Sequence, residues 1–125
     1  RTNFDWLSRD DAEVDKYIAD PYCGGVFTTG FFADLLHGIG IINDAKHVAR
    51  VPKDLPVHLF SGSRDPVGDN GKGVRSVASQ FRRAGLRDVT VDIYPEARHE
   101  ILNETNRDEV TGDVIGWLDE HLPHA

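Results

Sequence analysis

LPVHLFSGSRD at residues 55–65 and VTVDIYPEARH at residues 89–99 are the stretches of this sequence that decide its fold. The first holds a short, mostly apolar run from Leu55 to Ser61, which predicts a buried strand. In the second, apolar and other side chains alternate from Val89 to Tyr94 until Pro95 ends the run, which predicts a half-buried strand near a sheet edge. Residues 62–73 between them are rich in turn-forming residues.

Helical patterns surround these two strands. Apolar residues recur at helical spacing, and capping or breaking residues mark the ends of each run. We therefore expect a helix over 12–18 that is capped by Ser8 and stopped at Asp20-Pro21, one over 31–42 capped by Thr28 or Thr29, one from 74 closed by Gly85, and one over 110–122.

The alternation of strands and helices indicates an α/β fold with parallel strands. Only two strands are evident, and a sheet of two strands has too little area to bury these helices on both faces. The sequence also begins with Arg1 and contains no methionine. We expect from both observations that the sheet is incomplete and that the chain is not a complete translation product.

Composition excludes several classes of protein. The 125 residues are 39% hydrophobic, which is too apolar for a disordered chain. A net charge of −7, without a basic cluster, makes nucleic acid an unfavourable partner. No apolar run approaches the roughly 20 residues of an integral membrane span, and we expect no signal peptide. The single cysteine, Cys23, cannot form an internal disulfide, so we expect a cytoplasmic protein.

Two ionisable residues follow the carboxyl ends of the predicted strands. Asp65 comes after the first strand and His99 after the second, so adjacent parallel strands would bring them side by side. A carboxylate that orients an imidazole is the acid–base half of a nucleophilic catalytic triad. The residues alone leave other hypotheses open, because Asp65-Pro66 can form a simple turn and His99 can be a surface histidine.

At these segments the sequence resembles the C-terminal half of an α/β-hydrolase of the lysophospholipase and monoacylglycerol lipase type. PVHLFSGSRDPVG and VTVDIYPEARHEILNE carry the resemblance, together with Asp20-Pro21, residues 29–31 and Trp117-Leu118. The resemblance implies that Asp65 is the catalytic acid and His99 the catalytic histidine. It also implies that residues 1–30 are the end of a cap or lid and that residues 31–125 are the C-terminal half of the hydrolase core.

The resemblance has two gaps. No serine lies in the Gly-x-Ser-x-Gly pattern that carries the family's nucleophile, so we expect the nucleophile upstream of this chain. Glu96-Ala97-Arg98 stands where relatives often carry glycines, which implies a stiffer loop before the histidine.

The function implied by this resemblance is that of a serine hydrolase of monoacylglycerol or lysophospholipid esters, which needs no cofactor. The partner is then a small lipid-like ester, and the chain alone is inactive. We expect it to self-associate or to pair with the missing N-terminal half. The alternative is a non-catalytic α/β fragment or interaction module. Residues 68–73 lack the register of a phosphate loop, and His99-Glu100 does not continue into a zinc motif.

Overall fold

The computed structural model describes residues 1–122, so the last three residues of the predicted core segment lie outside the described residues. The chain forms six regular elements close to those predicted and two short helices that were not. In chain order the elements are α1 (Asp11–Ala19), α2 (Thr29–Asn43), α3 (Ala45–Val48), β1 (Val57–Gly62), α4 (Lys72–Arg83), β2 (Val89–Tyr94), the 3-10 helix η1 (Ile101–Asn103) and α5 (Arg107–His121).

The two predicted strands form one parallel pair, as expected. Val57 lies beside Val89 at one end of the pair, and Gly62 lies beside Tyr94 at the other. β1 begins two residues later than the sequence suggested, because Pro56 has no backbone N–H with which to pair. The sheet within residues 1–122 has only these two strands, so both of them are edge strands.

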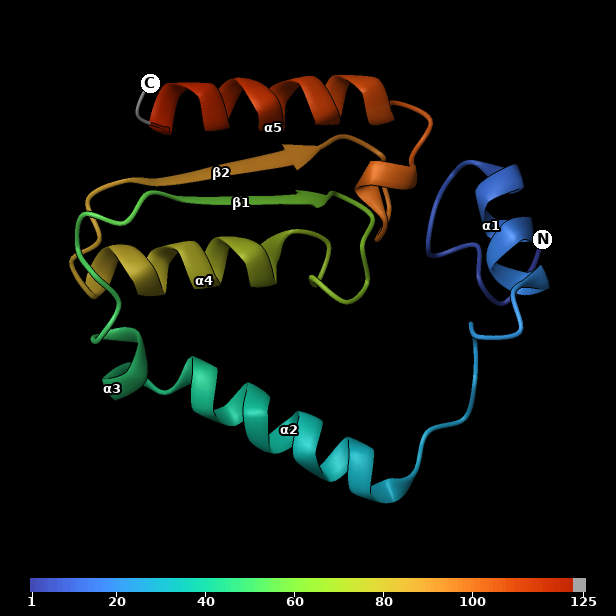
Figure 1. The fold of residues 1–125 in the computed structure, drawn as a ribbon, viewed down its shortest axis with the longest axis horizontal. Coiled ribbons are helices and arrows are strands. Elements are labelled where there is room, and N and C mark those ends of the chain that lie inside the picture. Colours follow the sequence, from blue (N-terminus) through green and yellow to red (C-terminus); the bar gives the residue numbers. More distant parts are fainter. Residues whose placement is uncertain (123–125) are drawn as a thin grey trace.

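Each face of the sheet is covered by a helix: α4 packs below it and α5 above it in the view of Figure 1. The buried core under α5 consists of Tyr94, Ala97, Ile101 and Val110, with Phe60 packed against it. Tyr94, the last residue of β2, is buried under α5, and its hydroxyl donates to Asp113 Oδ2 at 2.9 Å. The other residues of β2, from Val89 to Ile93, are half-buried, as expected for a half-buried second strand.

The first helix does not use its predicted cap. Asp10 caps α1, since its side chain accepts a hydrogen bond from the N–H of Ala12. Ser8 is fully buried instead, and its hydroxyl donates to the carbonyl of Asn103 at 2.8 Å. Asp20 ends the helix before Pro21, as predicted. The segment before α1 is thus tied to the chain that follows β2 (Figure 1).

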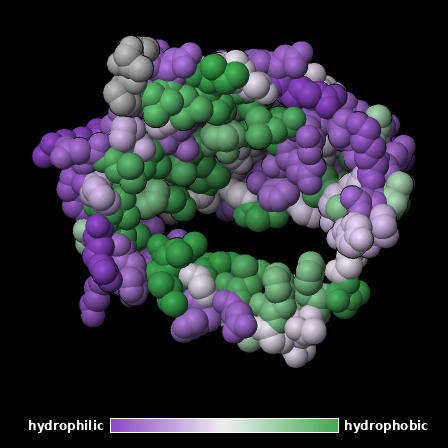
Figure 2. Space-filling view, viewed as in Figure 1, coloured by the Kyte–Doolittle hydropathy of each residue, from purple (hydrophilic) through white to green (hydrophobic). Residues whose placement is uncertain are grey.

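α2 is apolar along its length but makes few contacts with the other elements of residues 1–122. Thr28 caps it, as one of the two predicted alternatives, by accepting from the N–H of Phe31. No residue of α2 is buried, and an open gap separates it from the green hydrophobic surface above it in Figure 2. Its large apolar side chains are 42–68% exposed: Phe31, Phe32, Leu35, Leu36, Ile39, Ile41 and Ile42. Of the helices within residues 1–122, none is both long and apolar enough to cross a membrane.

Gly62 ends β1 where the backbone after β2 crosses it. A Cβ on this residue would stand 2.1 Å from the carbonyl oxygen of Ala97 and 2.3 Å from that of Arg98. Only a residue without a side chain allows the two segments to approach this closely.

Replacing Gly62 by alanine is expected to lower the free energy of unfolding by about 2–3 kcal/mol, because the two backbones must separate to admit the Cβ. Urea unfolding followed by circular dichroism measures the change. Gly25→Ala is the matched control, since its Cβ would meet no heavy atom within 4 Å. Equal unfolding free energies for the two variants would contradict the close approach at Gly62.

Candidate active site

The loops that follow β1 and β2 are joined by backbone hydrogen bonds. The N–H of Ser63 donates to the carbonyl of Tyr94 at 2.9 Å, and the N–H of Arg64 donates to that of Ala97 at 2.9 Å. The Ser63 hydroxyl in turn accepts from the N–H of Glu96 at 2.8 Å. Glu96 has a φ of 60°, in the left-handed region, so the turn before His99 takes a conformation that glycine adopts more easily.

This junction brings the two predicted site residues together. Asp65 Oδ1 lies 3.0 Å from Nδ1 of His99. The same oxygen accepts a hydrogen bond from the N–H of Val67 at 2.9 Å, so Asp65 also makes the turn that the sequence left as an alternative. Asp65 is only 7% exposed, which shields its contact with the imidazole from water. The structure thus places the carboxylate and the imidazole in hydrogen-bonding contact, while their catalytic role stays a prediction.

His99 is held by the segment before α1. Its N–H donates to the carbonyl of Trp6 at 3.3 Å, and the ring centroids of the two residues are 5.0 Å apart. The next N–H, that of Glu100, donates to the carbonyl of Leu7 at 2.8 Å. The imidazole remains 36% exposed. Within residues 1–122 its hydrogen bonding involves only Nδ1, which leaves Nε2 to exchange a proton with another group.

Serine and cysteine side chains are the nucleophiles that an imidazole of this kind could activate. No serine hydroxyl among residues 1–122 hydrogen-bonds to His99, and the Ser63 hydroxyl is engaged by Glu96. Cys23 is a poor alternative, because burial raises the pKa of its thiol and the neighbouring Asp20 raises it further. Chemically, a carboxylate in this contact can orient an imidazole through its Nδ1–H.

A second buried carboxylate, Glu104, lies in the loop that follows η1, and no sequence pattern predicts it. Glu104 is 0% exposed and joins the loop after β2 to Arg9, whose Nε donates to Glu104 Oε2 at 2.7 Å. Burial alone raises the pKa of Glu104. The hydrogen bonds from Arg9 and from the N–H groups of Arg98 and Thr105 outweigh that effect, so the pKa lies below its ordinary value of 4.5.

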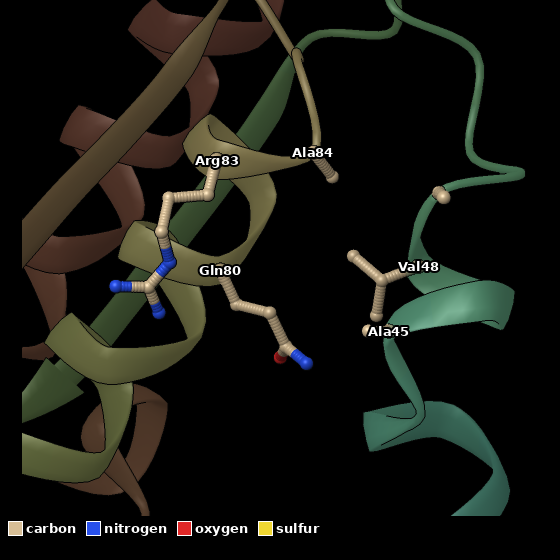
Figure 3. Close-up of a pocket in the computed structure, with 6 residues that line it drawn as sticks. Ala45, Val48, Gln80, Arg83 and Ala84 are labelled. Carbon is tan, nitrogen blue, oxygen red and sulfur yellow. The ribbon is translucent and has the colours of Figure 1, made fainter.

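Other features of the structure do not add to the site. Within the described part of the chain, no group of three or more His, Cys, Asp or Glu side chains is placed to hold a metal ion. Figure 3 shows a groove of about 400 Å³ between α3 and α4, lined by Ala45, Val48, Ala49, Gln80, Arg83 and Ala84. It lies at the C-terminal end of α4, on the opposite rim of the sheet from Asp65 and His99 (Figure 1).

The chain is similar to known hydrolases over most of its length. The model of the family described as serine aminopeptidase, S33, matches residues 1–106. A monoacylglycerol lipase of Mycolicibacterium smegmatis is 32% identical over 118 residues, which are 94% of this chain and 40% of that protein. A thermostable carboxyl esterase from Bacillus coagulans, solved with glycerol, matches with a TM-score of 0.83 and 31% identity over 96% of this chain and 39% of its own.

A lipase in its open form matches as well, with a TM-score of 0.82 and 32% identity over 92% of this chain and 37% of its own. The chain therefore spans about two fifths of the length of the relatives that it matches. The similar structures confirm the expected fold class, which is part of an α/β-hydrolase fold with an incomplete parallel sheet flanked by helices.

The buried Glu104 makes stability depend on pH. Because the pKa of Glu104 is lower in the folded than in the unfolded chain, its charge adds to the free energy of unfolding. This stabilisation is fully present above the ordinary pKa of 4.5 and is lost as pH falls through the folded pKa. Glu104→Gln is expected to lower the free energy of unfolding by about 3 kcal/mol at neutral pH. The difference between wild type and variant should shrink below pH 4.5 in urea unfolding at stepped pH. A difference that stays constant into strong acid would show that the charge of Glu104 contributes nothing.

Proposed function

The chain belongs to the family described as serine aminopeptidase, S33, and from this membership we propose that it supplies the acid and the base of a serine hydrolase that cleaves carboxyl esters. The observation that carries the proposal is the 3.0 Å contact between Asp65 Oδ1 and His99 Nδ1 at the carboxyl ends of two parallel strands. Similarity to proteins described as a monoacylglycerol lipase, a carboxyl esterase and a lipase supports ester cleavage.

The substrate class in this proposal is a monoacylglycerol or a lysophospholipid. One similar protein is described as a monoacylglycerol lipase, and another was solved in complex with glycerol, which is the alcohol that a monoacylglycerol releases. Residues 1–30 would be the end of the cap over the acyl pocket. Trp6 supports that assignment, because its ring is partly exposed and packs beside His99. The single cysteine is consistent with the cytoplasmic location that we include in the proposal.

The proposed reaction divides the chemistry between this chain and a serine outside it. The serine hydroxyl attacks the ester carbonyl while Nε2 of His99 takes its proton, and Asp65 holds Nδ1–H and stabilises the imidazolium. The imidazolium then protonates the leaving alcohol, which leaves an acyl-serine. Water, deprotonated by the same nitrogen, releases the fatty acid and restores the serine. Each step moves one proton through His99, and no metal or organic cofactor is required.

We further propose that the exposed apolar face of α2 and the free edges of the sheet pair with the remaining part of the fold. The relatives have about three fifths of their length outside the matched region, which is enough chain to supply further strands and helices. Without that part, the same surface would drive self-association.

Substitution at the two site residues tests the catalytic assignment in the full-length protein that contains this chain. His99→Ala is expected to lower kcat for a monoacylglycerol by about 10⁴-fold or more, because the base is lost. Asp65→Asn keeps the size of the side chain and should cost about 10³–10⁴-fold by stabilising the wrong tautomer. Ester hydrolysis that survives His99→Ala, or faster turnover of an amino-acid anilide than of the ester, would reject the proposal.

The isolated chain of residues 1–125 provides a second test. We expect no ester turnover, association detectable by light scattering, and enhanced fluorescence of an apolar dye, because α2 is uncovered. Leu36→Glu, on the exposed face of α2, should reduce both association and dye binding. A monomeric chain with little dye binding would favour a self-contained interaction module instead.

A further inference from the structure

The base role proposed for His99 underlies one further inference: we propose that Glu104 is a positioning residue that locks the His99 loop onto residues 5–9 and so fixes the imidazole against Asp65. Glu104 follows η1, five residues after His99, and its side chain is fully buried between that loop and Arg9.

The hydrogen bonds of Glu104 require a charged carboxylate. Oε1 accepts from the N–H of Arg98 at 2.7 Å and from the N–H of Arg9 at 3.1 Å. Oε2 accepts from Arg9 Nε at 2.7 Å and from the N–H of Thr105 at 3.1 Å. Each oxygen has two acceptor sites, so the four donors use all of them. A glutamine has the same shape but would turn an NH₂ group toward two of those donors.

Glu104 holds the residue directly before the proposed base, because its carboxylate binds the N–H of Arg98, which precedes His99. The N–H of Arg98 points to Glu104, and its guanidinium reaches back, with Nη1 donating to the carbonyl of Ser8 at 2.9 Å and to that of Asp5. The Ser8 hydroxyl completes the connection by donating to the carbonyl of Asn103. The loop that carries the imidazole is thus bound to residues 5–9 on both sides of His99.

A carboxylate in this position affects the rate through geometry. If Glu104 no longer holds Arg98, the backbone of His99 can move relative to Asp65, which is anchored separately by its own turn. Displacing a catalytic group by about 1 Å can cost about 10²-fold in rate. A residue that served only stability would lower the folded fraction without changing the turnover of each folded molecule.

The experiment compares Glu104→Gln with Glu96→Gln in the full-length protein. Glu96 is the matched control, because it lies in the same loop and its exposed side chain pairs, within residues 1–122, with the exposed Arg64 alone. Turnover of a monoacylglycerol is measured per folded molecule, well below the unfolding temperature. The downfield proton resonance of the His99–Asp65 hydrogen bond is recorded in parallel and assigned by its loss in His99→Ala.

We expect Glu104→Gln to lower kcat by about 10-fold or more, to change KM by less than about 2-fold, and to broaden the downfield resonance. Glu96→Gln should change none of these. A folded Glu104→Gln protein with unchanged kcat and resonance overturns the inference.

One further variant, together with His99→Ala, keeps the test decisive. If Glu104→Gln does not fold, Arg9→Ala removes one donor and leaves the carboxylate its other three, and it should lower kcat by about 3-fold and broaden the resonance. An unchanged Arg9→Ala protein would also overturn the inference. Activity retained in His99→Ala rejects the proposed function and this inference with it, whereas an inactive His99→Ala beside an unimpaired Glu104→Gln rejects this inference alone.

Discussion

At the carboxyl ends of β1 and β2, two backbone segments touch without a side chain between them. Gly62 makes this contact possible, and hydrogen bonds from Ser63 and Arg64 to the carbonyls after β2 fix its geometry. Paired backbone atoms vary little in position. The distance between Asp65 and His99 is therefore set first by the backbone hydrogen bonds of this junction. The placement of the Asp65–His99 contact depends on this junction.

The site is stabilised mainly by polar groups and only to a small extent by an apolar core. The core beneath α5 contains few large side chains, whereas Asp65 and Glu104 are both buried. Asp65 Oδ1 contacts the N–H of Val67 and Nδ1 of His99, and the carboxylate of Glu104 accepts four hydrogen bonds. Buried carboxylates of this kind are costly unless every acceptor is paired, and the pairing is what makes their positions unique. Paired polar groups of this kind explain how an incomplete sheet can still hold the His99 imidazole in one position.

Local patterns predicted the regular elements and the Asp65–His99 contact. The contact was predictable because the carboxyl ends of two paired parallel strands lie side by side at the same end of the sheet. Local patterns failed where partners come from far along the chain. Ser8 resembled a helix cap, but its hydroxyl bonds to Asn103, and Asp10 takes its place. Glu104 gave no signal, since its donors are backbone N–H groups and an arginine about 95 residues away. No periodicity or motif records such a contact.

Charged side chains join the start of α5 to the start of α1, whereas apolar contacts hold the layers around the sheet. Arg107 at the start of α5 bonds to Asp10 and Glu13 around the start of α1, and both pairs are partly open to solvent. Dissolved ions weaken such pairs, while agents that solvate apolar groups act on the layers around the sheet. The ion pairs between α1 and α5 and the apolar layers around the sheet therefore respond to different solvent conditions. Raising the ionic strength can loosen the ion pairs while the apolar layers stay intact.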